Sequence, residues 1–312
     1  PDGGFYASQV SSLECYDASG RLAWSRPLAD DLDTATASGP EGNCYVAAHS
    51  TLFAVDSSGK TRWTKPLQKS WHEHPPVVGP DGTVYFATHD GTVYAFDQEG
   101  EEMWHYQVPV SGNGFCPIKT KLSVGKDGTV AFGAGDELYL IREGRKLWGA
   151  RLGHGLESYD TPAVGEGLIY ASGGDRRDTV IAFDAATGEE KWRKTVGSVL
   201  HLTANPVGGV VVGLRGGPLF GLAVDGRHAW TYQDGNTFSQ PIPGPDGRWF
   251  TSTSGRYVKC FAPPVPLTEE ERLQQAAEQL ARPREENPQV VDLGGYLLVG
   301  GVPLRKRGAP GG

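Results

Sequence analysis

A tryptophan that follows a glycine by four residues recurs along the chain, and this repeat constrains the fold more than any other feature. The pairs are Gly20/Trp24, Gly59/Trp63, Gly100/Trp104, Gly144/Trp148, Gly188/Trp192 and Gly226/Trp230. Successive tryptophans are 39, 41, 44, 44 and 38 residues apart. A period near 40 residues, in segments rich in strand formers, is typical of the blades of a β-propeller.

The stretch that ends at Trp104 shows how one repeat folds. Pro80-Asp81-Gly82 predicts a turn, since Pro presets its own φ and Gly accepts a positive φ. Residues 83–88 and 92–96 are β-branched and aromatic, which predicts two strands on either side of an Asp90-Gly91 hairpin turn. Residues 101–106, which include Trp104, predict a third strand. Each repeat therefore predicts an antiparallel meander.

The whole chain predicts an all-β fold, a seven-bladed β-propeller of four-stranded antiparallel blades. With the strands of a blade labelled A to D, the first copy lacks strand A and the seventh lacks strand D. We expect blades in residues 1–265, one short helix in 266–283, a hairpin in 288–306 that completes or caps the propeller, and a disordered tail in 307–312. The C-terminal strands then close the ring, because an open blade edge exposes unpaired backbone groups. An eight-bladed propeller with a degenerate last blade is the alternative.

One copy carries a motif that is specific for a family. Five residues fit the pattern A-x-D-x-x-T-G-x-x-x-W: Ala182, Asp184, Thr187, Gly188 and Trp192. With its partial copies elsewhere, the chain resembles the PQQ-like (quinoprotein-type) β-propellers that carry this tryptophan-docking motif. The resemblance implies that the six repeated tryptophans (Trp24, Trp63, Trp104, Trp148, Trp192 and Trp230) wedge structurally between neighbouring blades. It selects no activity, because the family mixes dehydrogenases, outer-membrane assembly lipoproteins and sensor domains.

The sequence favours a non-catalytic protein, although whether it is an enzyme stays open. PQQ-dependent dehydrogenases carry adjacent cysteines against the cofactor, whereas Cys15, Cys44, Cys116 and Cys260 are far apart in this chain. We therefore expect no cofactor, PQQ included, and four reduced thiols that act as small hydrophobes. No G-x-S-x-G elbow or phosphate-binding loop occurs.

The links from each strand D to the next strand A vary most and should gather at one end of the central channel. Loops on a rigid scaffold often carry binding residues. The candidate residues on this loop face are Trp71, His72, His74, Asn113, Phe115, Glu157, Tyr159, Asp160, His201, Asn205, Phe238 and Gln240. Their aromatic and polar side chains predict a non-catalytic scaffold that binds a protein or peptide partner.

Three other interpretations of the loop face stay open. A small-ligand or carbohydrate sensor would use the same funnel, and a hydrolase or lyase would use carboxylates such as Glu157 and Asp160. The polar residues before the A strands could instead satisfy backbone groups around the channel. His72 and His74 share a face of an extended chain, but without a third ligand we expect no metal site.

Composition excludes further classes of function. The formal net charge of -8 argues against a nucleic-acid partner, which would require a basic footprint. No apolar run is long enough to span a bilayer, so we expect no transmembrane segment. Localisation stays open between the cytoplasm, which unpaired cysteines favour, and a bacterial envelope or periplasm, which the resemblance favours if a leader has been removed.

Overall fold

The computed structural model describes residues 4–9, 11–28, 35–48, 51–66, 74–88, 90–109, 118–153, 161–232, 239–243, 248–252, 258–261, 291–292, 296–299 and 302–305. Its contacts divide the chain into two units, residues 1–241 and 242–312. No helix in the described residues has the length and hydropathy needed to cross a membrane.

Seven antiparallel sheets form the blades, in chain order. The first is β1 (Phe5–Gln9), β2 (Ser12–Tyr16) and β3 (Leu22–Pro27). The second is β4 (Ala37–Ser38), β5 (Cys44–Ala48), β6 (Thr51–Val55) and β7 (Thr61–Pro66), with a 3₁₀ turn, η1 (Pro40–Gly42), between β4 and β5. The third is β8 (Val77–Val78), β9 (Val84–Ala87), β10 (Thr92–Phe96) and β11 (Glu102–Gln107). The fourth is β12 (Ser123–Val124), β13 (Val130–Ala134), β14 (Glu137–Arg142) and β15 (Arg145–Arg151).

The remaining blades follow the same order. The fifth is β16 (Ala163–Val164), β17 (Leu168–Gly173), β18 (Thr179–Asp184) and β19 (Glu190–Thr195). The sixth is β20 (Val199–Ala204), β21 (Val210–Leu214), β22 (Leu219–Leu222) and β23 (His228–Tyr232). The seventh is β24 (Ile242–Pro243), β25 (Trp249–Ser252) and β26 (Val258–Phe261).

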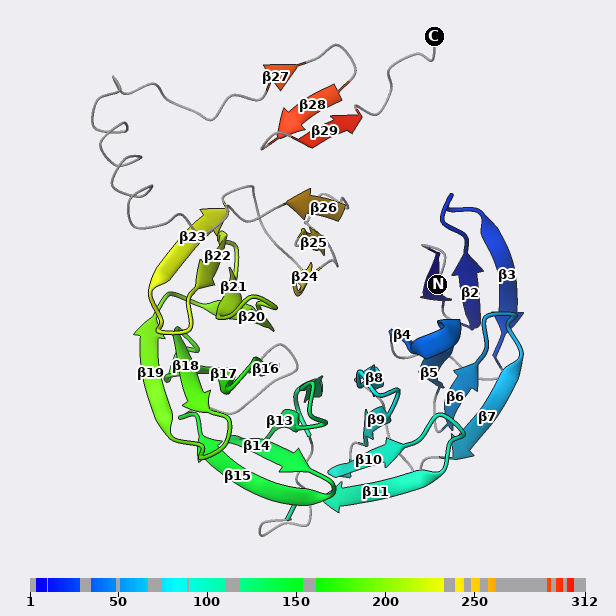
Figure 1. The fold of residues 1–312 in the computed structure, drawn as a ribbon, viewed down its shortest axis with the longest axis horizontal. Helices are drawn as coiled ribbons and strands as arrows, with labels where there is room; N and C mark the ends of the chain where they lie inside the picture. Colours follow the sequence, from blue (N-terminus) through cyan, green and yellow to red (C-terminus); the bar gives the residue numbers. More distant parts are fainter. Residues whose placement is uncertain are drawn as a thin grey trace. The chain divides into compact units, whose positions relative to one another are not determined.

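The fold is all-β, a seven-bladed β-propeller of antiparallel blades, which confirms the predicted fold class. As the repeat predicts, the described residues give the first blade no strand A and the seventh no strand D. Within residues 1–241, the short A strands β4, β8 and β16 lie on the inner side of the blades and the D strands β7, β11, β15 and β19 on the outer side (Figure 1).

The sequence pattern explains which strands are buried. The middle strands β5 and β9 are buried at every residue, because each packs between two neighbouring blades. The D strands alternate instead, with exposed residues on either side of a half-buried tryptophan. In each of the six blades that have strand D, its register against strand C shifts by one residue next to that tryptophan. Such a bulge increases the local twist of the strand.

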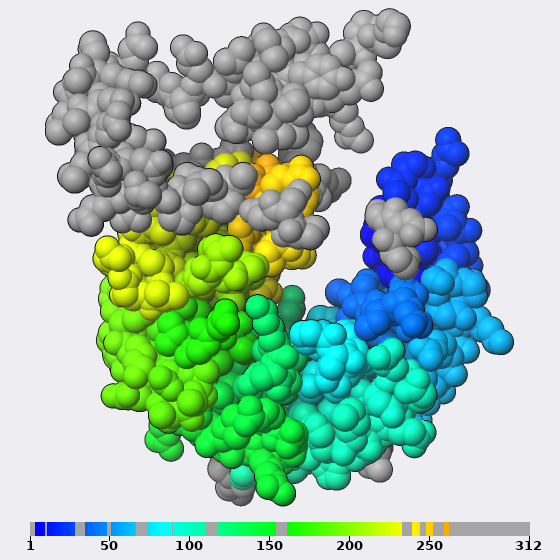
Figure 2. All heavy atoms as spheres, in the orientation of Figure 1, coloured from blue at the N-terminus to red at the C-terminus, as the bar shows by residue number. Residues whose placement is uncertain are grey.

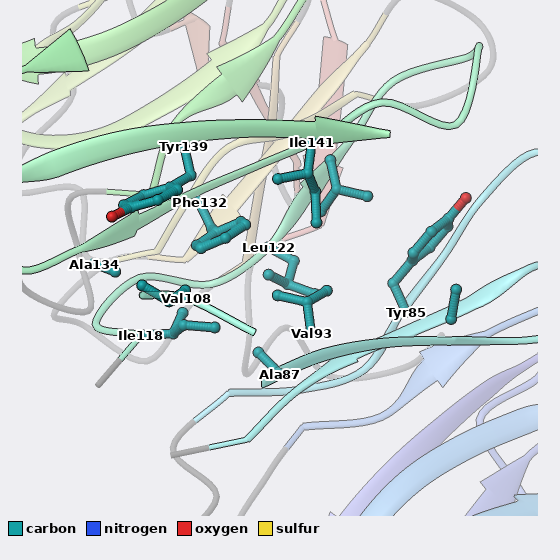
Figure 3. Close-up of a cluster of buried hydrophobic side chains, with 12 residues drawn as sticks. Tyr85, Ala87, Val93, Val108, Ile118, Leu122, Phe132, Ala134, Tyr139 and Ile141 are labelled. Carbon is teal, nitrogen blue, oxygen red and sulfur yellow. The ribbon is translucent and has the colours of Figure 1, made fainter. Parts of the chain in front are cut away.

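The hydrophobic core lies between blades and not within a single sheet. Figure 3 shows one cluster in which Val93 and Tyr85 of the third blade face Phe132, Leu122 and Ile141 of the fourth. The side chains of Val93 and Phe132 are fully buried. In the space-filling view of residues 1–241, the atoms of each blade lie directly against those of the next (Figure 2). Each blade therefore completes the core of its neighbour.

The repeated tryptophans connect successive blades through a shared set of contacts. Four indole Nε1–H groups donate to a carbonyl in the C–D turn of the next blade: Trp24 to Ser57 (2.9 Å), Trp63 to Gln98 (2.8 Å), Trp148 to Ala185 (2.9 Å) and Trp192 to Val224 (2.7 Å). The motif glycine of that turn lies under the ring, as Gly100 does under Trp63. A partly buried indole thereby finds a hydrogen-bond partner for its N–H group.

The C-terminal unit contains an eighth sheet, formed by β27 (Val291–Asp292), β28 (Tyr296–Val299) and β29 (Val302–Arg305). It has three strands where the sequence predicts a hairpin with its turn at Gly294-Gly295; a second pair, Gly300-Gly301, lies between β28 and β29 in the sequence. Closure of the propeller by this segment stays a prediction. The predicted helix at 266–283 and the predicted tail at 307–312 lie outside the described residues.

Candidate functional site

Most of the loop face predicted from sequence lies outside the described residues. This holds for eight of the twelve candidate positions: Trp71, His72, Asn113, Phe115, Glu157, Tyr159, Asp160 and Phe238. The structure describes the other four, His74, His201, Asn205 and Gln240. Within the described part of the chain, no group of three or more His, Cys, Asp or Glu side chains could hold a metal ion.

Three of the four described candidates lie at or near the starts of A strands. His74 precedes β8 and is buried, with 6% of its surface exposed. His201 lies within β20 and pairs with Gly213. Gln240 precedes β24, and its side-chain Nε2 donates to the carbonyl of Leu202 at 2.9 Å. The Gln240 side chain therefore satisfies a backbone group of the preceding blade, as one of the sequence interpretations expects.

Asn205 lies at the opposite end of its blade from these residues. Its N–H donates to the carbonyl of Gly209 at 3.0 Å, which closes the A–B turn. Gly79 occupies the same position in the third blade and donates to Thr83. The sequence places Asn205 in a D–A link because Pro206 resembles the proline that begins other A strands. Pro206 instead corresponds to the turn prolines Pro40 and Pro80, so Asn205 does not join the loop face.

The three described thiols are free, and one of them is deeply buried. Cys15, Cys44 and Cys260 form no disulfide. Burial raises the pKa of the Cys44 thiol to about 12, so this group stays protonated at neutral pH. Cys44 packs with Leu13 and Val46 as a small hydrophobe, whereas Cys116 lies outside the described residues.

The structure shows a groove at the end of the blades where the A–B and C–D turns lie. It has a volume of about 750 Å³ and extends over blades four, five and six. The side chains of Val164, Ile169, Ala185 and Ala204 contribute to its apolar lining. In an antiparallel meander the A–B and C–D turns share one end and the D–A links lie at the other. The groove is therefore on the face opposite the loop face.

Two shortened turns account for the groove. The C–D turn of blade four is only Glu143-Gly144, both with positive φ, whereas blade three uses residues 97–101. The A–B turn of blade five is residues 165–167, whereas blade four uses 125–129. In blade three the Gln98 side chain lies against Gly82 of the A–B turn. Blade four has no counterpart of Gln98, which leaves space there.

Most carboxylates that line the groove already have partners. Asp127 accepts from the Thr129 hydroxyl at 2.9 Å and from Arg142 at 3.2 Å. Burial raises the pKa of Asp127, but these hydrogen bonds and the Arg142 charge outweigh it and hold the pKa below its usual value. Asp184 accepts from the N–H groups of its own turn, and its pKa is also lowered. Both carboxylates are therefore structural and charged at neutral pH.

Sequence reasoning missed the groove, although a signal for it is present. The spacing between tryptophans hides the short turns, because the long D–A links before blades four and five compensate for the missing residues. An alignment of the turns alone would reveal Glu143-Gly144 and Gly165-Glu166-Gly167 as the two short ones. The groove depends on two neighbouring repeats, so no single motif reports it.

The fold and these contacts define a class of protein, the β-propellers whose blades are docked by tryptophans. The chain matches a family described as "Outer membrane protein assembly factor BamB" over residues 9–150 and 126–247. It belongs to this family, which confirms the predicted PQQ-like repeat.

Two relatives show the extent of the likeness. The outer membrane protein assembly factor BamB of Burkholderia pseudomallei (strain K96243) is 34% identical over 122 residues, which cover 38% of this chain and 31% of that protein. The match thus spans about a third of the curated relative. The crystal structure of BamB from Moraxella catarrhalis aligns with a TM-score of 0.53 at 18% identity, over 82% of this chain and 90% of that one, and supports the fold.

Proposed function

We propose that this chain is a non-catalytic scaffold that binds a protein or peptide partner during the assembly of outer membrane proteins. The match of residues 9–247 to a family described as an outer membrane protein assembly factor carries the proposal. The docked tryptophans support it, because blades that are fixed to one another hold surface residues in a constant arrangement. We expect this scaffold to act without a cofactor.

The loop face is the proposed contact surface for this partner. Trp71, Tyr159 and Phe238 are the aromatic residues that would serve as anchors, because aromatic side chains supply much of the energy of protein interfaces. The proposal for these residues rests on the sequence, since all three lie outside the described residues.

Deletion of the gene in its own bacterium tests the assembly role. We expect the outer membrane proteins, measured by quantitative mass spectrometry of the outer membrane, to fall in amount and the wild-type chain to restore them. The triple variant Trp71→Ala, Tyr159→Ala, Phe238→Ala should restore them poorly. The matched control is Leu22→Ala with Met103→Ala, two exposed apolar residues outside the loop face.

Two results would count against the proposal. If the amounts of outer membrane proteins were unchanged after deletion of the gene, the proposed assembly role would be wrong. Full restoration by the triple variant would leave the role intact but exclude these three anchors. Circular dichroism of each purified variant shows whether a loss reflects folding.

A further inference from the structure

The sixth blade carries apolar residues where other blades carry polar ones, on the face that holds the groove. Val207 is 85% exposed in the A–B turn. The same turn position is Asp81 in blade three and Asp127 in blade four. Val224 of the C–D turn is also exposed and lies beside Gly208 of the A–B turn. The two turns of this blade therefore expose apolar side chains at the end of the blades that holds the groove.

This apolar surface is continuous with the groove. Ala204 and Pro206 line the groove, and Val207 follows Pro206 directly in the chain. Leu147 of blade four, with 43% of its surface exposed, contributes to the lining at another blade. Apolar residues of blades four, five and six therefore contribute to the lining of the groove.

Two charged groups at the groove remain available to a ligand. Asp127 is paired with Arg142, and Asp184 lies 3.4 Å from Lys191. Lys126 of blade four and Glu166 of blade five are exposed, and neither forms an ion pair within the described part of the chain. The groove therefore offers one positive and one negative group on neighbouring blades, beside its apolar lining residues.

We propose that this groove binds an extended segment of a partner protein in which apolar side chains are accompanied by one acidic and one basic residue. An extended segment presents alternate side chains to one side, so its apolar side chains contact the floor while its charges reach Lys126 and Glu166. The proposal rests on the proposed scaffold function for the class of partner, but it places binding on the face opposite the loop face. Charge complementarity then fixes the direction of the segment.

A selection with a random dodecapeptide phage library on the full chain tests this assignment. The matched counter-selection uses the double variant Val207→Asp, Ala186→Glu. Both changes install residue types that equivalent turns already carry, as at Asp81 and Glu99, so the variant should fold. We expect enriched peptides with apolar, acidic and basic residues, and at least a tenfold weaker affinity for the double variant by fluorescence anisotropy.

Charge reversal tests the direction of binding. Lys126→Glu should weaken an enriched peptide by about threefold to tenfold, and reversal of the peptide's own acidic residue to Lys should restore its affinity. Leu22→Asp, an exposed apolar residue outside the groove, should leave the affinity within twofold.

Each of three results would overturn the assignment. These are the absence of enriched peptides, equal binding to the wild type and to the double variant, and a loss in Leu22→Asp as large as that in the double variant. The assignment would also be overturned if no peptide were enriched and a small molecule from a thermal-shift screen stabilised the wild type but not the double variant. Restoration of outer membrane proteins by the double variant in the deletion strain would refute the groove alone and leave the scaffold role standing.

Discussion

At the scale of single residues, the interface between blades depends on a glycine as much as on a tryptophan. Gly100 has a φ of 84° and lies under the ring of Trp63. A Cβ at position 100 would come within 2.6 Å of that ring. Gly20 has nearly the same φ, 79°, but a Cβ there would have no neighbour within 4 Å. A comparison of the same substitution at Gly20 and at Gly100 therefore separates the cost of backbone strain from the cost of disturbing the contact with Trp63.

This pair predicts unequal losses of stability. Gly20→Ala should lower the free energy of unfolding by about 1–2 kcal/mol, the cost of a left-handed residue with a Cβ. Gly100→Ala should lower it by roughly 1–3 kcal/mol more, because Trp63 must also move. Urea unfolding followed by circular dichroism measures both. Equal losses in the two variants would show that the contact under Trp63 contributes nothing.

At the scale of elements, the C–D turn is held together by one aspartate. Asp56 accepts from the Ser58 hydroxyl at 2.6 Å, from the Ser58 N–H at 2.9 Å and from the Lys60 N–H at 3.0 Å. The hydrogen bond from Ser58 is the main cause that lowers the pKa of Asp56. Asp17, Asp184 and Asp225 cap their own turns, and the pKa of each is also lowered.

These turns predict loss of stability in acid. A carboxylate whose pKa is lower in the folded state stabilises the fold above its unfolded pKa of about 3.9. That contribution disappears as the pH falls through the folded pKa. The urea midpoint should therefore drop below about pH 4, and Asp56→Asn should make the drop shallower. If the urea midpoint of Asp56→Asn fell with pH in parallel with that of the wild type, Asp56 would not contribute to the loss of stability in acid.

The repeat and the groove differ in how far the sequence predicts them. A glycine recurs four residues before each repeated tryptophan, and the glycine of one blade lies under the tryptophan of the preceding blade, as Gly100 does under Trp63. With a seventh, incomplete copy, this repeat predicts seven blades. The position of Asn205 does not follow from the sequence, because Pro206 fits a turn and the start of a strand equally well. The groove arises from Glu143-Gly144 in one blade and Glu166 in the next, and only their packing together reveals it.

At the scale of the whole molecule, the proposed function requires that the propeller hold surface residues in fixed positions for another protein to bind. Docking by tryptophans connects successive blades, and we expect the surface residues that depart from the repeat to determine what is bound. Val207 is such a residue on the groove face, and Trp71 is the corresponding candidate on the loop face. A partner protein in direct contact with one of these faces is therefore the expected state in the cell.

Site-specific photo-crosslinking in living cells tests this most directly. A photoreactive phenylalanine replaces Val207 in one version of the full chain and Trp71 in another, with Leu22 as the control position, and each version must still restore outer membrane proteins in the deletion strain. The expected result is a discrete adduct at position 207, absent at position 22, whose partner segment is extended and carries apolar, acidic and basic residues. No adduct at Val207 or at Trp71, in cells where the chain restores outer membrane proteins, would contradict the claim that it works by binding a protein partner.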